Sequence, residues 1–162
     1  MLFKVSFKET KKEPSKVIEK AGGTTIVTLR GVVDLPEFWC NIPKEIHSWI
    51  SGNTKVELYE NIANNTLIIF SQGTSRCMDG DKFDSLLGER LAEARAKYII
   101  YKFFYDLTFK LYNYYDRVMF GSQGVVCSGT GSCIAQDIKK YEGLCIRESR
   151  HIGELLKSKE NE

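Results

Sequence analysis

One helical pattern dominates the order of hydrophobic and polar positions in this chain, and it runs from about Asp84 to Met119. Apolar or aromatic side chains recur in it at alternating steps of four and three residues, the heptad spacing of a helix that packs lengthwise against another helix. This first seam consists of Leu87, Leu91, Ala94, Tyr98, Tyr101, Tyr105, Thr108, Tyr112, Tyr115 and Met119. A second seam keeps the same rhythm only in the C-terminal half of the helix, at Ile100, Phe104, Leu107, Leu111, Tyr114 and Val118. That half therefore carries more apolar surface than one neighbour can cover.

The length of this helix bears on self-association. At about 1.5 Å per residue it would span roughly 52 Å, whereas a compact domain of this size has a diameter of about 40 Å. A straight helix would then expose its tyrosines unless it breaks or pairs with a second copy. Because no Pro or Gly lies between Glu89 and Phe120 to break it, we expect a homodimer or a higher homo-oligomer.

Five positions of the first seam are tyrosines, whose hydroxyl groups need a partner when they are buried. One interpretation is a wide, hydrated interface between helices. The other is a cleft in which the tyrosine rings stack on a flat ligand such as a nucleobase, while arginines bind its phosphate. The stacking surfaces of that cleft would be Tyr98, Tyr101, Tyr105, Tyr112 and Tyr115, and its charges Arg95 and Arg117.

The first half of the chain alternates short β patterns with turn residues. Strands are predicted at Leu2–Lys8, Thr24–Val33, Lys55–Glu60 and Thr66–Phe70, and a short helix at Pro43–Ile50 that ends at Gly52. The charged segment Lys11–Lys20 contains Pro14 and is predicted to be a loop. Ser71–Thr74 is predicted to be a tight turn or a bulge, and the sequence shows no internal repeat.

Together these patterns predict a single α+β domain over residues 1–162. An antiparallel sheet within residues 1–78 would pack on the long helix, at about 84–119. A loop rich in glycine and serine would follow, and then shorter helices within residues 132–158, the first of them ending at Gly143.

Composition narrows the function classes. The 23 Lys+Arg residues against 21 Asp+Glu give a formal charge of +2, which is too balanced to indicate a nucleic-acid or membrane partner by charge alone. No apolar run reaches the roughly 18 residues of a transmembrane helix, and the first residues lack the pattern of a secretory signal. We therefore expect a cytoplasmic protein. Five scattered cysteines and two distant histidines indicate reduced thiols, no metal site and no cofactor.

The glycine- and serine-rich loop contains one candidate anion site. Its backbone N–H groups, just before a predicted helix, form the kind of nest that binds phosphate. The residues concerned are Gly129, Thr130, Gly131 and Ser132. The pattern lacks the lysine of a P-loop, so a surface loop without a ligand is the alternative.

Other chemical motifs are not supported. The run from Asp79 to Asp84 is similar to a calcium loop, but Asp84 comes one place late and Arg90 occupies the position of the bidentate glutamate. No nucleophile elbow, zinc-protease motif or Cys–His pair occurs at a recognised spacing. We expect no catalytic residues and a protein that is not an enzyme.

The segment before and at the start of the long helix resembles a signature of small bacteriophage-encoded accessory proteins. In that signature an Arg/Lys-Cys strand end leads to Asp-x-Phe-Asp, then to Gly and a Leu-Ala-x-x-Arg helix. The matching residues here are Gly73-Thr74-Ser75-Arg76-Cys77-Met78-Asp79-Gly80-Asp81-Lys82-Phe83-Asp84, followed by Gly88, Leu91, Ala92, Arg95 and Ala96. In structural terms Asp81 and Asp84 would cap the helix, Phe83 would fix its entry, and Gly88 would let it lie close on the sheet.

This resemblance implies a viral or prophage protein that acts in the cytoplasm of a bacterial host. Such proteins include inhibitors of host immunity, among them oligomeric sponges of the Thoeris anti-defence type that sequester cyclic nucleotide or cyclic ADP-ribose signals. Our leading hypothesis is a non-enzymatic, oligomeric accessory protein that counters host defence by sequestering a nucleotide-like signal. The alternatives are an inhibitor that masks a host effector protein with its aromatic helix face, and a nucleic-acid-binding module.

Overall fold

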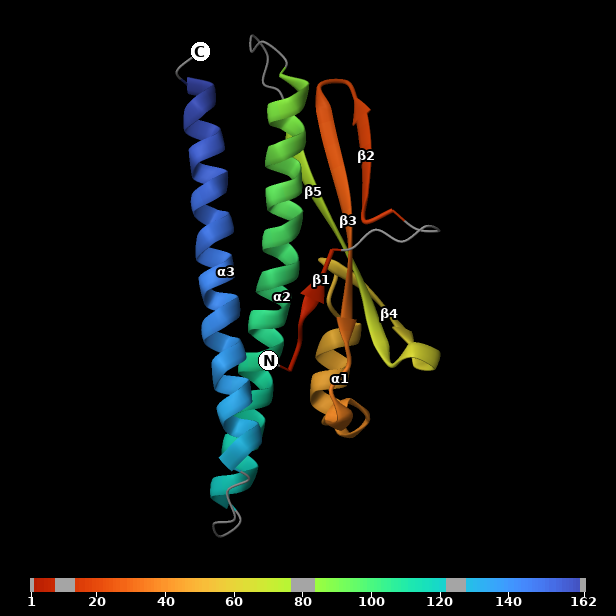
Figure 1. The fold of residues 1–162 in the computed structure, drawn as a ribbon, viewed down its shortest axis with the longest axis vertical. Helices are drawn as coiled ribbons and strands as arrows, with labels where there is room; N and C mark the ends of the chain where they lie inside the picture. Colours follow the sequence, from red (N-terminus) through yellow and green to blue (C-terminus); the bar gives the residue numbers. More distant parts are fainter. Residues whose placement is uncertain (1, 8–13, 77–83, 122–127, 161–162) are drawn as a thin grey trace.

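The computed structural model describes residues 2–7, 14–76, 84–121 and 128–160, which form an antiparallel sheet followed by two long helices (Figure 1). The strands are β1 (Val5–Ser6), β2 (Lys16–Ala21), β3 (Thr24–Asp34), β4 (Val56–Asn61) and β5 (Thr66–Arg76). The helices are η1 (Glu37–Asn41), α1 (Lys44–Ser51), η2 (Ile62–Asn64), α2 (Ser85–Gly121) and α3 (Ser128–Glu160). The predicted α+β class is confirmed.

Two hairpins of the same shape build the sheet. In each, a 6-residue strand precedes an 11-residue strand: β2 before β3, and β4 before β5. The two long strands form the central pair and stay in register from Thr24 opposite Arg76 to Asp34 opposite Thr66. Each short strand pairs with the first half of its long strand. A half-turn about an axis perpendicular to the sheet therefore exchanges the hairpins, an internal repeat that the sequence does not reveal.

The molecule is layered, with α2 between the sheet and α3 (Figure 1). Burial alternates along β3 and β5, because every second side chain points towards α2. The helix α1 packs on the same side, where the ring of Trp49 stacks on that of Phe103 at 5.4 Å. Among the described residues no helix covers the opposite face of the sheet.

Small residues let α2 lie directly on β5. A Cβ atom on Gly73 would come within 1.9 Å of the carbonyl oxygen of Ala92, so only glycine fits at this position. The hydroxyl groups of Ser71 and Ser75 donate hydrogen bonds to the carbonyls of Ala96 and Gly88, at 2.9 and 2.7 Å. The close approach predicted from Gly88 is confirmed, since a Cβ there would lie 3.1 Å from the Ser75 hydroxyl.

The start of α2 is capped as the sequence predicts. The carboxylate of Asp84 accepts hydrogen bonds from the N–H groups of Leu86 and Leu87, at 2.8 and 3.0 Å. These two donors have no partner within the helix, so the cap satisfies them. The predicted roles of Asp81 and Phe83 fall on residues outside the described ranges.

The N-terminal segment is held by α3. The buried carboxylate of Asp137 accepts hydrogen bonds from the N–H groups of Leu2 and Phe3, at 2.8 and 2.9 Å. The hydroxyl of Tyr141 donates to the carbonyl of Phe3 at 2.7 Å. Because these backbone groups bond to side chains of α3, the strand predicted over Leu2–Lys8 is reduced to β1.

The loop prediction for Lys11–Lys20 is wrong from Lys16 onwards, where β2 begins, and residues 11–13 lie outside the described ranges. Lys16 and Lys20 lie on the side of this edge strand that faces α2. There the ammonium of Lys16 lies 3.2 Å from the carboxylate of Glu89 and 3.0 Å from that of Glu93. The hydrogen bond to Glu93 raises the pKa of Lys16. Two of the charges that favour a loop, those of Lys16 and Lys20, are therefore paired with α2.

Two further boundaries differ from the sequence analysis. Ser71–Thr74 is not a turn but part of β5, since Gly73 serves the contact with α2. In the C-terminal part the described residues form one helix in place of the several shorter helices predicted. This helix, α3, begins at Ser128 and continues through Gly143 to Glu160, while residues 122–127 of the predicted loop lie outside the described ranges. A helix that packs along α2 gains contacts over its whole length, which offsets the low helix propensity of one glycine, about 1 kcal/mol.

Candidate functional site

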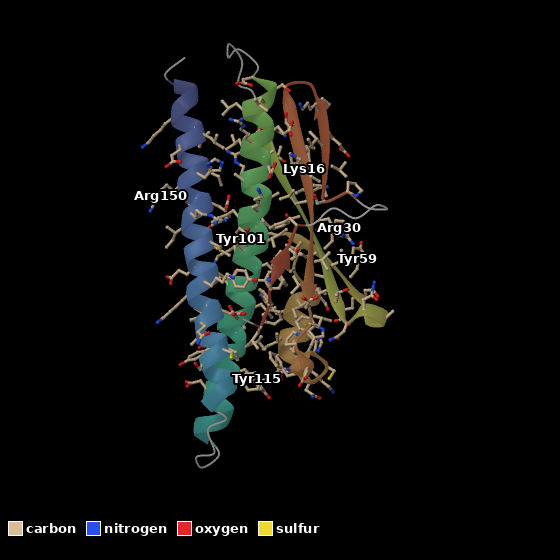
Figure 2. The ribbon with its side chains drawn as sticks, in the orientation of Figure 1. Lys16, Arg30, Tyr59, Tyr101, Tyr115 and Arg150 are labelled. Atoms are coloured by element: carbon tan, nitrogen blue, oxygen red, sulfur yellow. The ribbon has the colours of Figure 1, made fainter. Side chains whose placement is uncertain are left out.

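Part of the tyrosine seam of α2 is covered by α3 of the same chain, whereas Tyr112 stays 38% exposed. Tyr101 is only 8% exposed, and its ring centre lies 6.3 Å from that of Tyr141 on α3 and 6.1 Å from that of Phe7. Tyr115 packs on Phe38, at the other end of α2 (Figure 2). The sequence analysis predicts that the seam is covered either by a break in the helix or by a second copy. Pairing of α2 with α3 in the same chain is a third way to cover it. The predicted tyrosines do not converge on one cavity.

Tyr98 lines a groove between α2 and α3. Its other lining residues all come from α3, and the groove has a volume of about 430 Å³. They are Cys145, Ile146, Ser149 and Arg150. We call this feature, together with the adjoining Lys102 and Tyr105 of α2, the α2–α3 groove.

The positively charged side chains at the α2–α3 groove are those of Lys102 and Arg150. The ammonium of Lys102 lies 4.7 Å from the ring centre of Tyr105 and 2.7 Å from the carboxylate of Asp106. The hydrogen bond to Asp106 raises the pKa of Lys102, so this lysine stays cationic at neutral pH. Arg150 is exposed on α3 (Figure 2) and has no ion pair within the described part of the chain. A flat anionic molecule would meet an aromatic ring and two cations here.

The thiol in the groove is not activated. Burial raises the pKa of Cys145; the nearby Lys102 opposes this shift, and Asp106 adds to it. A thiol with a raised pKa is protonated at neutral pH and is a weak nucleophile. The two histidines offer no base beside it, because His47 lies in α1 against Trp39 and His151 does not line the groove. The chemistry of the groove therefore suits binding better than covalent catalysis.

The predicted arginines lie apart from the groove. The guanidinium of Arg95 donates a 2.5 Å hydrogen bond to the carbonyl of Thr74, at the edge of β5 that β4 leaves unpaired. Arg117 is exposed about 28 Å along the helix axis from Tyr98, at about 1.5 Å per residue. Neither arginine meets the tyrosines in a common pocket.

The predicted anion nest also has a different structure. Gly129, Thr130, Gly131 and Ser132 belong to the first turns of α3 and not to a loop. Ser132 lies about 20 Å along the axis from Cys145, at about 1.5 Å per residue. The structure therefore does not bring these residues to the α2–α3 groove.

Sequence reasoning missed the half of the groove that α3 supplies. The signal was present, because α3 carries its own heptad rhythm in steps of four and three. It consists of Ile134, Ile138, Tyr141, Cys145, Glu148 and Ile152, which are buried or half-buried. Gly143 conceals this rhythm, because glycine is typical of a helix end.

No family model, curated protein or solved structure matches this chain. Within residues 2–7, 14–76, 84–121 and 128–160, no group of three or more His, Cys, Asp or Glu side chains could hold a metal ion. None of the helices formed by these residues has the length and apolarity to cross a membrane. The resemblance to phage accessory proteins stays a prediction.

Proposed function

We propose that this protein is a non-enzymatic binding protein, a phage accessory factor that counters host defence by sequestering a nucleotide-like signal in the α2–α3 groove. The observation that carries the proposal is the combination of Tyr98 with two cations, Lys102 and Arg150, around one groove. The ring would stack on a base, and the cations would pair with phosphate. Such stacking is worth about 1–3 kcal/mol per base.

The state of the groove supports binding without turnover. Its thiol is protonated, and its lysine is held by Asp106 rather than by a group that could deprotonate it. The open form of the groove limits how much of a ligand one copy can enclose. We therefore expect affinity from charge and stacking together, which makes binding weaken as salt rises.

Calorimetry with cyclic dinucleotides and cyclic ADP-ribose tests this function. Saturable binding is expected, and the ligand released by heat should elute from a column chemically unchanged. Tyr98→Leu and Arg150→Gln should each weaken binding about tenfold, equivalent to about 1.4 kcal/mol. Tyr98→Phe keeps the ring and should bind nearly as well as the native protein.

Arg90→Gln is the matched control, since Arg90 is an exposed arginine of α2 outside the groove. Equal losses for Arg90→Gln and Arg150→Gln would show only a general charge effect. The absence of binding to every nucleotide would refute the proposal, and an altered product would identify an enzyme.

One observation favours the second candidate, an inhibitor that binds a host effector protein. Phe109 and Tyr112, three residues apart on one face of α2, are 47% and 38% exposed. Exposed aromatic clusters mark protein interfaces more often than ordinary surface. In this case a defined host effector should bind the native protein, and Phe109→Ser should abolish the complex while Tyr98→Leu leaves it intact.

A further inference from the structure

One side of strand β5 has no partner strand along its C-terminal end. β4 pairs with β5 only from Thr66 to Ser71, whereas β3 pairs with it over its whole length. Within the described part of the chain, residues 72–76 therefore form an edge of the sheet. This edge is about 17 Å long at about 3.4 Å per residue. Figure 1 shows β4 beside one end of β5 only.

The register shows which backbone groups point to this open edge. The N–H of Arg30 donates a hydrogen bond to the carbonyl of Ser15 at 2.8 Å, so the even-numbered residues of β3 point away from β5. The odd-numbered residues of β3 and β5 then bond to each other, because the bonding direction alternates along antiparallel strands. The N–H and C=O groups of Gln72, Thr74 and Arg76 therefore point to the open edge.

A side chain of α2 already bonds to this edge. The guanidinium of Arg95 donates to the carbonyl of Thr74 at 2.5 Å, where a neighbouring strand would place an N–H group. An added strand can replace this bond without loss to the sheet, since no bond between β3 and β5 depends on it. Arg95 would then be free to pair with a carboxylate of that strand.

A hollow of about 340 Å³ lies where β4 begins and the open edge starts. Its lining includes Val56 of β4, Gln72 of β5 and Ile99 of α2. A strand that runs antiparallel to β5 continues the line of β4, so its C-terminal end would reach this hollow. The hollow thus provides room for side chains of an added strand.

The charges around the edge favour an acidic strand. Arg76 and Arg95 lie along it, and Lys55 lines the hollow together with Glu57. Three cations therefore face the added strand against one carboxylate. Two copies of this edge would bring their Arg95 side chains together, which disfavours pairing of the chain with itself.

We propose that the open edge of β5 binds an acidic, extended segment of a partner protein by strand addition, antiparallel to β5 and in line with β4. Hydrogen bonds to the backbone of residues 72–76 provide affinity, and ion pairs with Arg76 and Arg95 select acidic side chains. This site lies apart from the α2–α3 groove and adds a protein partner to the proposed nucleotide ligand.

Fluorescence anisotropy with a labelled peptide tests the site in the full chain. The probe is a seven-residue peptide in which glutamate and valine alternate, and its neutral counterpart has glutamine in place of glutamate. The acidic peptide should bind saturably in a titration to about 1 mM. The neutral peptide should bind about fivefold more weakly, as expected for the loss of two exposed ion pairs.

Methylation of the peptide backbone tests the mode of binding. Methyl groups on the nitrogen atoms of alternate residues remove the N–H groups from one edge of the peptide and leave the other edge intact. Of the two alternately methylated peptides, one should bind at least about tenfold more weakly and the other nearly as well as the parent. Equal effects of the two patterns would overturn strand addition.

Thr74→Pro tests the location. Proline removes an N–H group that points to the open edge, so the fold should persist while binding falls at least about tenfold. Ile18→Pro is the matched control, since the N–H of Ile18 points away from β3 on the edge strand β2. It should leave binding unchanged. Circular dichroism checks both folds, and if Thr74→Pro fails to fold, Arg95→Glu should still weaken binding of the acidic peptide at least about fivefold.

The absence of binding by either peptide would overturn the proposal and would leave Arg76 and Arg95 as charges that protect the edge from pairing. Binding that Ile18→Pro abolishes and Thr74→Pro spares would also overturn it, by placing the peptide at β2. Thr74→Pro should leave nucleotide calorimetry unchanged, and Tyr98→Leu should leave peptide binding unchanged. Failure of this proposal is therefore distinguishable from failure of the proposed function.

Discussion

At the scale of single residues, two glycines have opposite roles. Gly73 is required by space, since the main chain of α2 occupies the place where its side chain would be. Gly143 has open space around it, with nothing within 4 Å of the position of a Cβ. Gly73 therefore fixes the distance between sheet and helix, and Gly143 only lowers helix propensity.

Gly73→Ala should destabilise the fold strongly. Either β5 or α2 must move to remove the 1.9 Å contact with the Ala92 carbonyl, and both are backbone. Overpacking of this kind costs about 3 kcal/mol, which corresponds to a fall in melting temperature of about 6–12 °C for a chain of this size. Thermal unfolding followed by circular dichroism measures it, and an unchanged melting temperature would mean that the layers are less tightly packed.

Gly143→Ala is the matched change in the opposite direction. An added methyl group meets no neighbour, and alanine favours the helix by about 0.8–1 kcal/mol over glycine. The melting temperature should rise by about 2–4 °C. A fall would indicate that α3 bends or ends at this residue.

At the scale of elements, the sequence correctly predicts the helices and strands that are determined by their own pattern of hydrophobic and polar residues. The heptad rhythm predicted α2 nearly to its ends, and the β-branched run of residues 24–33 predicted β3. The prediction fails where the structure of a segment depends on contacts with a distant part of the chain. Lys16 fits a strand because Glu89 and Glu93 lie opposite, and Gly73 fits a strand because α2 passes over it.

The same reasoning applies to the candidate site. Tyr98 was predicted and lines the groove, whereas Tyr105 lies only beside it, under the ammonium of Lys102. The α3 residues were missed because a helix continuing through Gly143 is stabilised by packing on α2, which no local pattern shows. Tyr101 became core for a related reason, since α3 covers it.

At the scale of the whole molecule, α2 is the shared support of two separate surfaces. One of its sides faces α3 and forms the groove, and the other side carries the sheet.

The contact of Asp137 with Leu2 and Phe3 joins positions 135 and 134 residues apart in sequence. Translation proceeds from the N-terminus, so these two residues leave the ribosome long before their partner is synthesised. The first segment is therefore anchored only after α3 has been synthesised. Docking of this segment is expected to be a late step in the folding of the protein.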